Sequence, residues 1–299
     1  MSDDSSGALS WWTEAARPRT LPAAVAPVLV ASALAANAGS FALEPAAICL
    51  AFALLIQIGT NFANDYFDFK KGADNEDRVG PRRAVAAGLI SPAAMKRAMT
   101  AVFALAFLVG LSLLPYGGWP LLLVGITSIF CGVVYTGGPY PLAYHGWGDV
   151  FVFVFFGLVA VTATYFVQAG EITPEAWFLG AAMGALSTNI LIVNNYRDVE
   201  TDRAAGKRTL VVRFGQTFAR RQFAFGHGVM ASMVLLLILR RIIGPVEGIA
   251  VALIGAWLGF RQMRDLRAAE SPAELIALLG RTGRHLALMA MLVAIALVL

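Results

Sequence analysis

The chain has 299 residues, of which 58% are hydrophobic and 14% are charged, with a formal net charge of +4 and a mean hydropathy of +0.69. Soluble domains carry about 25% charged residues, so this composition excludes an ordinary soluble protein and predicts an integral membrane protein. The basic excess requires no nucleic-acid partner, because membrane orientation and contact with anionic lipid or an anionic substrate explain it. We therefore expect the lipid bilayer, and no nucleic acid, among its partners.

The first residues, MSDDSSGALS, are acidic and polar, unlike a secretory signal peptide. We predict a flexible cytosolic tail over residues 1–16 and a single transmembrane domain over residues 17–299. Apolar stretches near spanning length recur after the tail, which predicts an all-α, polytopic membrane bundle of about nine transmembrane helices. The predicted spans are residues 20–36, 45–64, 98–115, 119–136, 150–168, 176–195, 222–239, 245–260 and 284–299.

Basic residues are distributed unequally between the loops that join these spans. With the N-terminus inside, only Arg240 and Arg241 of the 23 lysines and arginines lie in an opposite-side loop, which leaves 21 on one side. The positive-inside rule makes the basic side cytosolic. We therefore predict a multi-pass protein of the inner or plasma membrane, with the N-terminus and the active-site loops in the cytosol.

Two clusters of acidic and amide residues, NFANDYFDFKKGAD and NNYRDVETD, lie about 130 residues apart, each at the predicted cytosolic end of an apolar stretch. Asn64 and Asp68 are four residues apart, as are Asn194, Asp198 and Asp202, so each set projects from one face of a helix. Carboxylates crowded at the edge of a low-dielectric bundle repel one another unless a cation lies between them. Oxygen ligands suit Mg²⁺, which usually completes its shell with substrate phosphates.

Basic residues surround both clusters and favour a phosphate-bearing substrate, because lysine and arginine bind phosphate oxygens directly. Arg83 and Lys207 each lie in a short glycine-containing loop after the acids, where the backbone can approach an anion closely. The alternative is that these cations only set the orientation in the membrane. The predicted diphosphate-binding residues beside the clusters are Lys70, Lys71, Arg78, Arg83, Lys207 and Arg208.

These motifs resemble those of the UbiA superfamily of intramembrane prenyltransferases. The similar segments are ANDYFDFKKGAD, DRVGPRRAVAAGLISPAAMKRA, YTGGPYPLAYHGWGDVFVFVFFG and NNYRDVETDRAAGKRTLVVRFG, and the resemblance extends from about Arg17 to Gly215. It is strongest to the branch that acts on 1,4-dihydroxy-2-naphthoate in menaquinone synthesis. The resemblance implies Mg²⁺-dependent transfer of a polyprenyl group from polyprenyl diphosphate to this aromatic acceptor, with loss of the acceptor's carboxylate.

The resemblance also implies roles for the residues that match the family's motifs. Asp74 would replace an acid that the first motif often carries at the position of Gly72. Arg83 and Lys207 would hold phosphate, and Arg17 matches an Arg-Pro pattern of the family at the entrance to the first span. The implied Mg²⁺ ligands are Asn64, Asp68, Asp74, Asn194, Asp198 and Asp202.

Diphosphate leaves carbon readily only when its charge is neutralised, which Mg²⁺, lysine and arginine achieve together. The allylic cation that forms needs a dry pocket with aromatic faces. Asp149 or Tyr135 would assist the acceptor hydroxyl by taking or sharing its proton, and the sequence does not decide between them. The aromatic candidates are Tyr135, Phe153, Phe156 and Tyr196, and the candidate catalytic residues are Asp68, Asp198, Lys207, Tyr135 and Asp149.

Two alternatives stay open. One is a prenyltransferase for another aromatic acceptor, such as 4-hydroxybenzoate. The other is a secondary transporter, because internal repeats and intramembrane carboxylates also occur in those folds. Transporter acids lie near the middle of the membrane, whereas the two clusters lie at the ends of predicted spans. The prenyl chain length and the oligomeric state are not predicted from the sequence.

Overall fold

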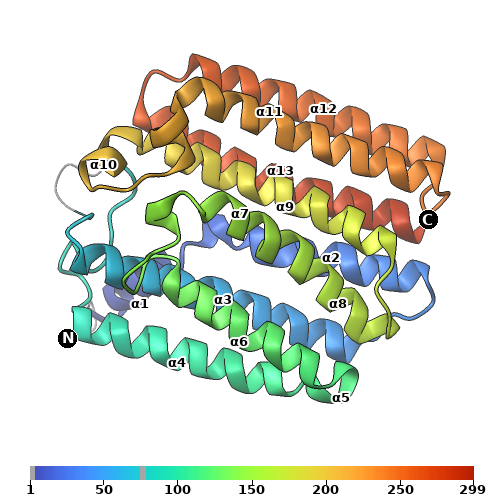
Figure 1. Cartoon of the computed structure of the whole chain (residues 1–299), viewed down its shortest axis with the longest axis horizontal. Coiled ribbons are helices and arrows are strands. Elements are labelled where there is room, and N and C mark those ends of the chain that lie inside the picture. The colour runs from blue at the N-terminus through green and yellow to red at the C-terminus, as the bar shows by residue number, and fades with distance from the viewer. Residues whose placement is uncertain (1–3, 75–78) are drawn as a thin grey trace.

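The computed structural model of the protein describes residues 4–74 and 79–299. Within these ranges all regular secondary structure is helical, and the long helices run side by side in one elongated bundle (Figure 1). The elements are α1 (Asp4–Ala16), η1 (Pro18–Thr20), α2 (Pro22–Asn37), α3 (Leu43–Lys70), α4 (Pro92–Leu111), α5 (Leu114–Gly117), α6 (Trp119–Val134), η2 (Ala143–His145), α7 (Gly148–Phe153), η3 (Val154–Val159), α8 (Ala160–Ala169), α9 (Pro174–Arg197), α10 (Val199–Ala204), α11 (Leu210–Leu239), α12 (Pro245–Ala268) and α13 (Pro272–Val298).

In the described ranges six helices are long and apolar enough to cross a membrane: α3, α4, the continuous α7–η3–α8 rod, α9, α11 and α13. A seventh span results if α2 and the helical segment before it, bent by 52°, are counted together. The all-α membrane fold is thus confirmed, whereas the predicted number of nine spans is not. Each predicted range does overlap a helix, but α6 has only 16 residues and α12 carries Glu247 and Arg261 in its apolar sequence.

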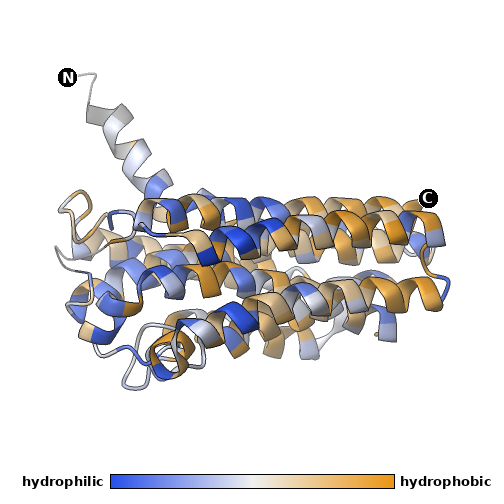
Figure 2. Cartoon of the chain, turned by 90° about the horizontal axis from the view of Figure 1, so that it is seen from above, coloured by the Kyte–Doolittle hydropathy of each residue, from blue (hydrophilic) through white to orange (hydrophobic). Residues whose placement is uncertain are grey.

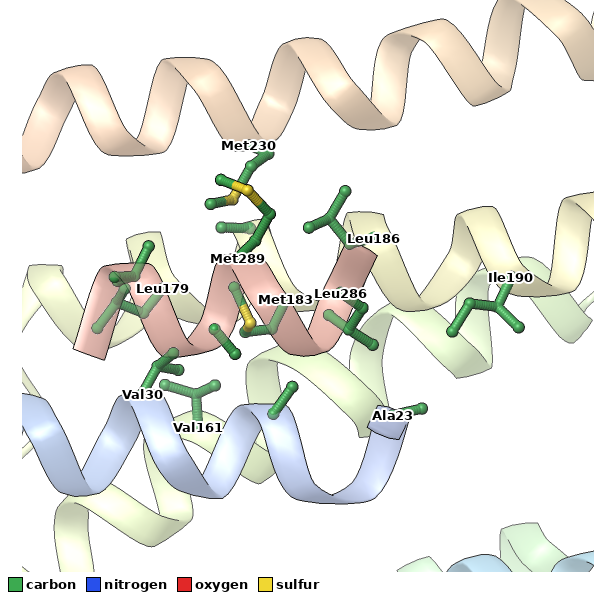
Figure 3. Packing of buried hydrophobic residues seen from close by; sticks show 14 of the residues in the cluster. Ala23, Val30, Val161, Leu179, Met183, Leu186, Ile190, Met230, Leu286 and Met289 are labelled. Carbon is green, nitrogen blue, oxygen red and sulfur yellow. The ribbon is translucent and has the colours of Figure 1, made fainter. Parts of the chain in front are cut away.

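Helix α9 lies at the centre of the main apolar core. It packs against α11, α13, α2 and the α7–α8 rod, and 78% of its most apolar segment is buried. Figure 3 shows Leu179 and Met183 of α9 among Val30 of α2, Met230 of α11 and Met289 of α13. Because lipid tails are as apolar as these side chains, shape complementarity between helices stabilises such a core in a membrane.

Glycines allow the α7–α8 rod to approach α9 closely. Gly157, in the π-helical turn η3, faces Gly180 and Gly184 of α9, and a Cβ atom at Gly157 would clash with the backbone of both. Small residues at such crossings are typical of membrane bundles. The contact fixes one wall of the cavity described below.

Residues Asp4–Ala16, within the segment for which we predicted a flexible tail, form helix α1, and residues 1–3 of that segment lie outside the described residues. Ala15 is buried, and the ring of Trp12 packs edge-on against Phe62 of α3 with a centroid separation of 5.6 Å. The apolar run around Trp12 thus docks the end of an otherwise polar segment. Figure 2 shows α1 projecting from the bundle at the end where hydrophilic residues gather.

Candidate active site

The last turns of α3 place the first cluster at the hydrophilic end of the bundle. Asn64 and Asp68 lie one turn apart, and both are buried. The helix ends in a cap in which the amide of Gly72 donates to the carbonyl of Phe69, and the amide of Ala73 donates to the carbonyl of Asp68. Gly72 has φ of 69°, a left-handed conformation that favours glycine. This geometry gives a physical reason for glycine at the position where the family often carries an acid.

Asp68 is held by two residues that are distant in the sequence. The Tyr144 hydroxyl donates to Asp68 Oδ1 at 2.8 Å, and Lys207 Nζ donates to Oδ2 at 3.2 Å. One turn earlier, Asn64 Oδ1 accepts a hydrogen bond from Thr136 Oγ1 at 2.9 Å. The loops before α7 and after α10 therefore meet the polar face of α3.

The second cluster lies at the junction of α9 and α10 and has its own counterion. Arg197 donates from Nε to Asp198 Oδ1 at 2.7 Å and from Nη2 to Asp198 Oδ2 at 2.6 Å, and Nη2 also donates to Asn194 Oδ1 at 2.9 Å. Only 2% of the Arg197 side chain is exposed. Sequence reasoning passed over Arg197, because an arginine at the basic end of a span is explained by orientation alone. A bidentate pair of this kind is charge-assisted and geometrically specific.

Lys207 links the two clusters. Its Nζ atom lies 3.2 Å from Asp68 Oδ2 and 3.8 Å from Asp202 Oδ1. The loop that carries it repeats the cap of α3, because the amide of Lys207 donates to the carbonyl of Asp202 and Gly206 has φ of 73°. The positive charge of Lys207 thus lies between Asp68 and Asp202, which are 134 positions apart in the sequence.

Tyr144 occupies the centre of this arrangement, and nothing in the sequence singled it out. The Nζ atoms of Lys71 and Lys207 lie over its ring, 4.7 and 4.9 Å from the centroid, and its carbonyl accepts from the amide of Arg208 at 2.8 Å. Burial, and then the negative charge of Asp68, raise the pKa of the Tyr144 hydroxyl, so it remains a hydrogen-bond donor. Burial also lowers the pKa of Lys71, although the charge of Asp68 opposes the shift.

Asp65, next to the polar face of α3, anchors the following loop. Its two carboxylate oxygens accept hydrogen bonds from the amides of Ala84 and Val85 at 3.1 and 3.2 Å. This loop carries Arg83, whose Nε lies 3.5 Å from Oδ2 of the buried Asp74. Asp65 thus contributes to the site by positioning the basic loop.

The other cations predicted beside the clusters differ in how closely they approach this centre. Lys71 Nζ donates to the carbonyl of Thr136 at 2.7 Å, whereas Lys70 Nζ lies 5.4 Å from the centroid of the Tyr66 ring. Arg208 is exposed. Lys71 therefore lies in the site, and Lys70 and Arg208 are at its periphery.

Arg17 joins α1 to η1 with a left-handed backbone, φ 53°, which is uncommon for a residue other than glycine. Its Nη2 donates to the carbonyl of Asn61 at 3.4 Å, one turn of α3 before Asn64. Arg78 lies outside the described residues, so its predicted role is not placed.

An apolar cavity of about 1060 Å³, counted with its opening, lies between α2, α3, α6 and the α7–α8 rod. Tyr135, directly after α6, lines it at the hydrophilic end and lies within electrostatic range of Asp68 and Asp202. Leu113 and Leu121 line it toward the opposite end of the bundle. The acids and cations therefore lie near the end of the apolar chamber that Tyr135 lines.

Only some of the candidate aromatic residues line the cavity. Phe156 lines the cavity, whereas Phe153 and Tyr196 are not among its lining residues. Phe151 and Phe155, stacked with their centroids 5.9 Å apart, form the wall with Phe156. The π-helical turn begins at Val154, and because it adds a residue to the helix, it changes the side on which the residues after it lie relative to Phe153.

Asp149 also lies away from the cavity lining. It is buried at the start of α7, and its Oδ1 accepts from Nε2 of Gln222 in α11 at 3.0 Å. Of the two candidates for assisting the acceptor, Tyr135 therefore faces the chamber, and Asp149 joins α7 to α11.

The donor set of the two clusters fits a hard cation, because it consists of carboxylate and amide oxygens. Among the described residues, no three His, Cys, Asp or Glu side chains converge in a ready-made metal site. Instead Lys207 and Arg197 supply positive charge to Asp68 and Asp198. A cation would bind by displacing these side chains from the carboxylates.

Fold and site together define a polytopic helical membrane protein with acidic and basic residues near one end of an apolar chamber. Residues 24–281 match the UbiA prenyltransferase family. The chain belongs to this family, which confirms the resemblance found in its motifs.

The chain is similar to proteins named 1,4-dihydroxy-2-naphthoate octaprenyltransferase. It is 38% identical over 286 residues to the protein of Mycobacterium tuberculosis, covering 96% of each chain, and 42% identical over 219 residues to that of Escherichia coli, covering 71% of each. A solved structure of a UbiA homolog from Archaeoglobus fulgidus, bound to DMAPP and Mg²⁺, aligns with a TM-score of 0.69 at 16% identity and covers 96% of this chain and 99% of that chain. The structural likeness supports the fold.

Proposed function

We propose that the protein transfers a polyprenyl group from polyprenyl diphosphate to 1,4-dihydroxy-2-naphthoate, with Mg²⁺ and with loss of the acceptor's carboxylate, to give demethylmenaquinol in menaquinone synthesis. The observation that carries the proposal is Lys207, held between acids of both clusters near the end of the apolar cavity that Tyr135 lines. Relatives named for this acceptor align over 96% of the chain.

The two clusters would bind the diphosphate together. Mg²⁺, when bound, supplies charge that stabilises the departing diphosphate. Lys207 and Arg197, once displaced from Asp68 and Asp198, would donate to phosphate oxygens, and Lys71 and Arg83 would add to this set. The residues that would hold the ion are Asn64, Asp68, Asp198 and Asp202, with Asn194 and Asp74 in support.

The reaction divides between the polar centre and the chamber. The bond between prenyl C1 and the diphosphate oxygen breaks, and both electrons leave with the diphosphate. The acceptor ring then forms a carbon–carbon bond at the carbon that bears the carboxylate. Carbon dioxide departs and returns its bonding electrons to the ring, so charge and atoms balance.

The chamber would hold the prenyl chain and exclude water from the allylic cation. Its lining is almost entirely apolar, with Phe151, Phe155 and Phe156 on one wall. Tyr135 is the polar residue of the lining that lies nearest the acids, so its hydroxyl would bind the acceptor's hydroxyl and orient the ring. Asp149 would act by holding the start of α7 through the hydrogen bond that it accepts from Gln222 of α11.

The orientation in the membrane forms part of the proposal. We place the N-terminus and both clusters in the cytosol of an inner or plasma membrane, and residues 17–299 in one transmembrane domain onto which α1 docks. The support is the basic end of the bundle, because 21 of 23 lysines and arginines belong to segments on the predicted cytosolic side.

The test is prenyl transfer by the purified protein from labelled polyprenyl diphosphate to 1,4-dihydroxy-2-naphthoate, with Mg²⁺ or with chelator. We expect a decarboxylated prenyl naphthoquinol that forms only with Mg²⁺. Product with 4-hydroxybenzoate but not with the naphthoate would overturn the acceptor. No product with any acceptor, together with substrate-dependent ion flux in proteoliposomes, would favour a transporter.

A further inference from the structure

Helix α12 lies at the edge of the bundle, and its main contacts are with α11 and α13 (Figure 1). Five exposed residues, spaced alternately by four and three, form a stripe along its outer face. Such spacing places them on one side of a helix. We call this set the α12 stripe: Leu253, Trp257, Phe260, Arg264 and Arg267.

The chemistry of the α12 stripe changes in order along the helix. Leu253, Trp257 and Phe260 are 65%, 57% and 65% exposed, and the two arginines follow toward the hydrophilic end. Tryptophan is enriched where membrane proteins cross the lipid headgroup boundary. Arg264 lies about 10 Å beyond Trp257 along the axis, at 1.5 Å per residue. The order from aliphatic to aromatic to cationic matches that of a phospholipid from acyl chain to phosphate.

A hollow lies beside the basic part of the stripe. Phe260, Met263, Arg264, Arg267 and Ala268 line it, and its volume, open to the surroundings, is about 590 Å³. Two guanidinium groups beside one hollow suit a phosphate, which arginine binds through two parallel hydrogen bonds.

Neighbouring acids do not neutralise the positive charge beside the hollow. Asp265 lies 3.2 Å from Arg281 of α13 and 3.9 Å from Arg264, so the closer pair is the one with α13. The guanidinium of Arg261 lies over the Trp257 ring at 5.0 Å from its centroid. Arg261 thus adds a further positive charge at the level of the aromatic residues.

We propose that the α12 stripe binds an anionic phospholipid, with its phosphate between Arg264 and Arg267 and an acyl chain along Phe260, Trp257 and Leu253. Helix α12 packs along the membrane-spanning helices α11 and α13, so its outward face meets lipid, and the positive charge of this face selects an anionic headgroup. A second copy of the chain fits less well. Two copies share one orientation in a membrane, so a two-fold contact through the stripe would place arginines opposite arginines.

The experiment is native mass spectrometry of the full detergent-purified protein, titrated with phosphatidylglycerol or with phosphatidylcholine of the same acyl chains. We expect tighter binding of phosphatidylglycerol. Arg264→Gln/Arg267→Gln should weaken that binding roughly 25-fold, at about fivefold per arginine, and leave phosphatidylcholine binding unchanged. Both arginines are exposed, so the variant should keep the wild-type melting temperature.

The matched control is Lys96→Gln/Arg97→Gln, which removes two exposed cations near the start of α4, at the same end of the bundle. This control variant should retain the wild-type preference for phosphatidylglycerol over phosphatidylcholine. Equal binding of the two lipids by the wild type would overturn the proposal, as would equal losses in the two double variants. A change from dimer to monomer in Arg264→Gln/Arg267→Gln, with lipid binding intact, would assign the face to a second copy instead.

Discussion

The two acidic clusters obtain their counterions in opposite ways. Asp68 is bound by Tyr144 and Lys207, which lie 76 and 139 residues further along the chain. Asp198 is bound by Arg197, its immediate neighbour. The first cluster is therefore assembled by the fold, whereas the second is compensated within its own helix end.

The geometry of the two helix-end caps shows which residues occupy equivalent positions in the two clusters. Asp68 and Asp202 each accept a capping hydrogen bond from a residue five positions later, directly after a left-handed glycine, Gly72 or Gly206. One turn before each lies a different side chain, the neutral Asn64 in the first cluster and the charged Asp198 in the second. The second cluster thus has one more carboxylate at the equivalent position. Arg197 offsets this additional buried charge.

The largest effect should follow from removing the charge of the acid that the fold assembles. We expect Asp68→Asn to lower kcat/KM for prenyl transfer by roughly 10²–10³, the loss typical when a charge-stabilising group is removed. The protein should remain folded, since the amide keeps the shape of the carboxylate. Glu200→Gln, an exposed acid on α10, is the control and should keep most of the activity. Near-normal turnover by Asp68→Asn would show that this acid takes no part in the reaction.

The second cluster is tested through stability. Arg197→Gln leaves Asp198 buried without its counterion, and loss of one partner of such a pair costs about 3 kcal/mol of the free energy of unfolding. Added Mg²⁺ should raise the melting temperature of this variant more than it raises that of the wild type. Arg203→Gln breaks the exposed pair with Glu200 and should change stability by less than about 1 kcal/mol. Similar melting temperatures for both variants would show that the Arg197 pair is not structurally important.

Lys207 connects the clusters, so its loss should affect both. Lys207→Met should weaken diphosphate binding by about 2 kcal/mol, because a charged hydrogen bond to phosphate disappears. Lys207→Arg keeps the charge and should recover part of the affinity. The measurement is the KM for polyprenyl diphosphate, with Lys96→Met as the control at an exposed site. Equal KM values for Lys207→Met and wild type would contradict a role in binding diphosphate.

The smallest effect is expected at Tyr144. Tyr144→Phe keeps the ring that the Lys71 and Lys207 ammonium groups lie over but removes the hydrogen bond to Asp68, which should lower kcat by about tenfold, or about 1.4 kcal/mol. Since the folded pKa of this hydroxyl is raised, its contribution is present below the ordinary tyrosine pKa and is lost only as pH rises through the higher folded value. The loss should therefore be constant from neutral to mildly alkaline pH. A loss that disappears over that range would contradict the hydrogen bond.

Much of the fold could be predicted from local sequence. Hydropathy located the long helices, and the spacing of Asn64 and Asp68 placed them on one face, because both depend on short-range periodicity. The number of spans did not follow, since α12 mixes apolar residues with Glu247 and Arg261. Helix α1 did not follow either, because Trp12 is ordered by a contact with Phe62, 50 positions away.

The candidate site was only partly predictable for the same reason. Helix packing brings Tyr144 and Lys207 to Asp68, and no local sequence motif encodes that packing. Asp65 differs from Asp68 by three positions, yet its role depends on the amides of Ala84 and Val85. The π-helical turn changed which phenylalanines line the cavity. Residue types and spacing predicted the kind of chemistry, and the tertiary contacts determined the partners.

Both clusters should bind one diphosphate between them. We would measure the affinity of inorganic diphosphate by calorimetry in Mg²⁺ for the wild type, Asp68→Asn, Asp202→Asn and the double variant. We expect the double variant to lose less binding free energy than the sum of the two single losses, with a coupling energy of about 1 kcal/mol or more. Losses that simply add would show that the two clusters act on separate ligands and would contradict shared binding.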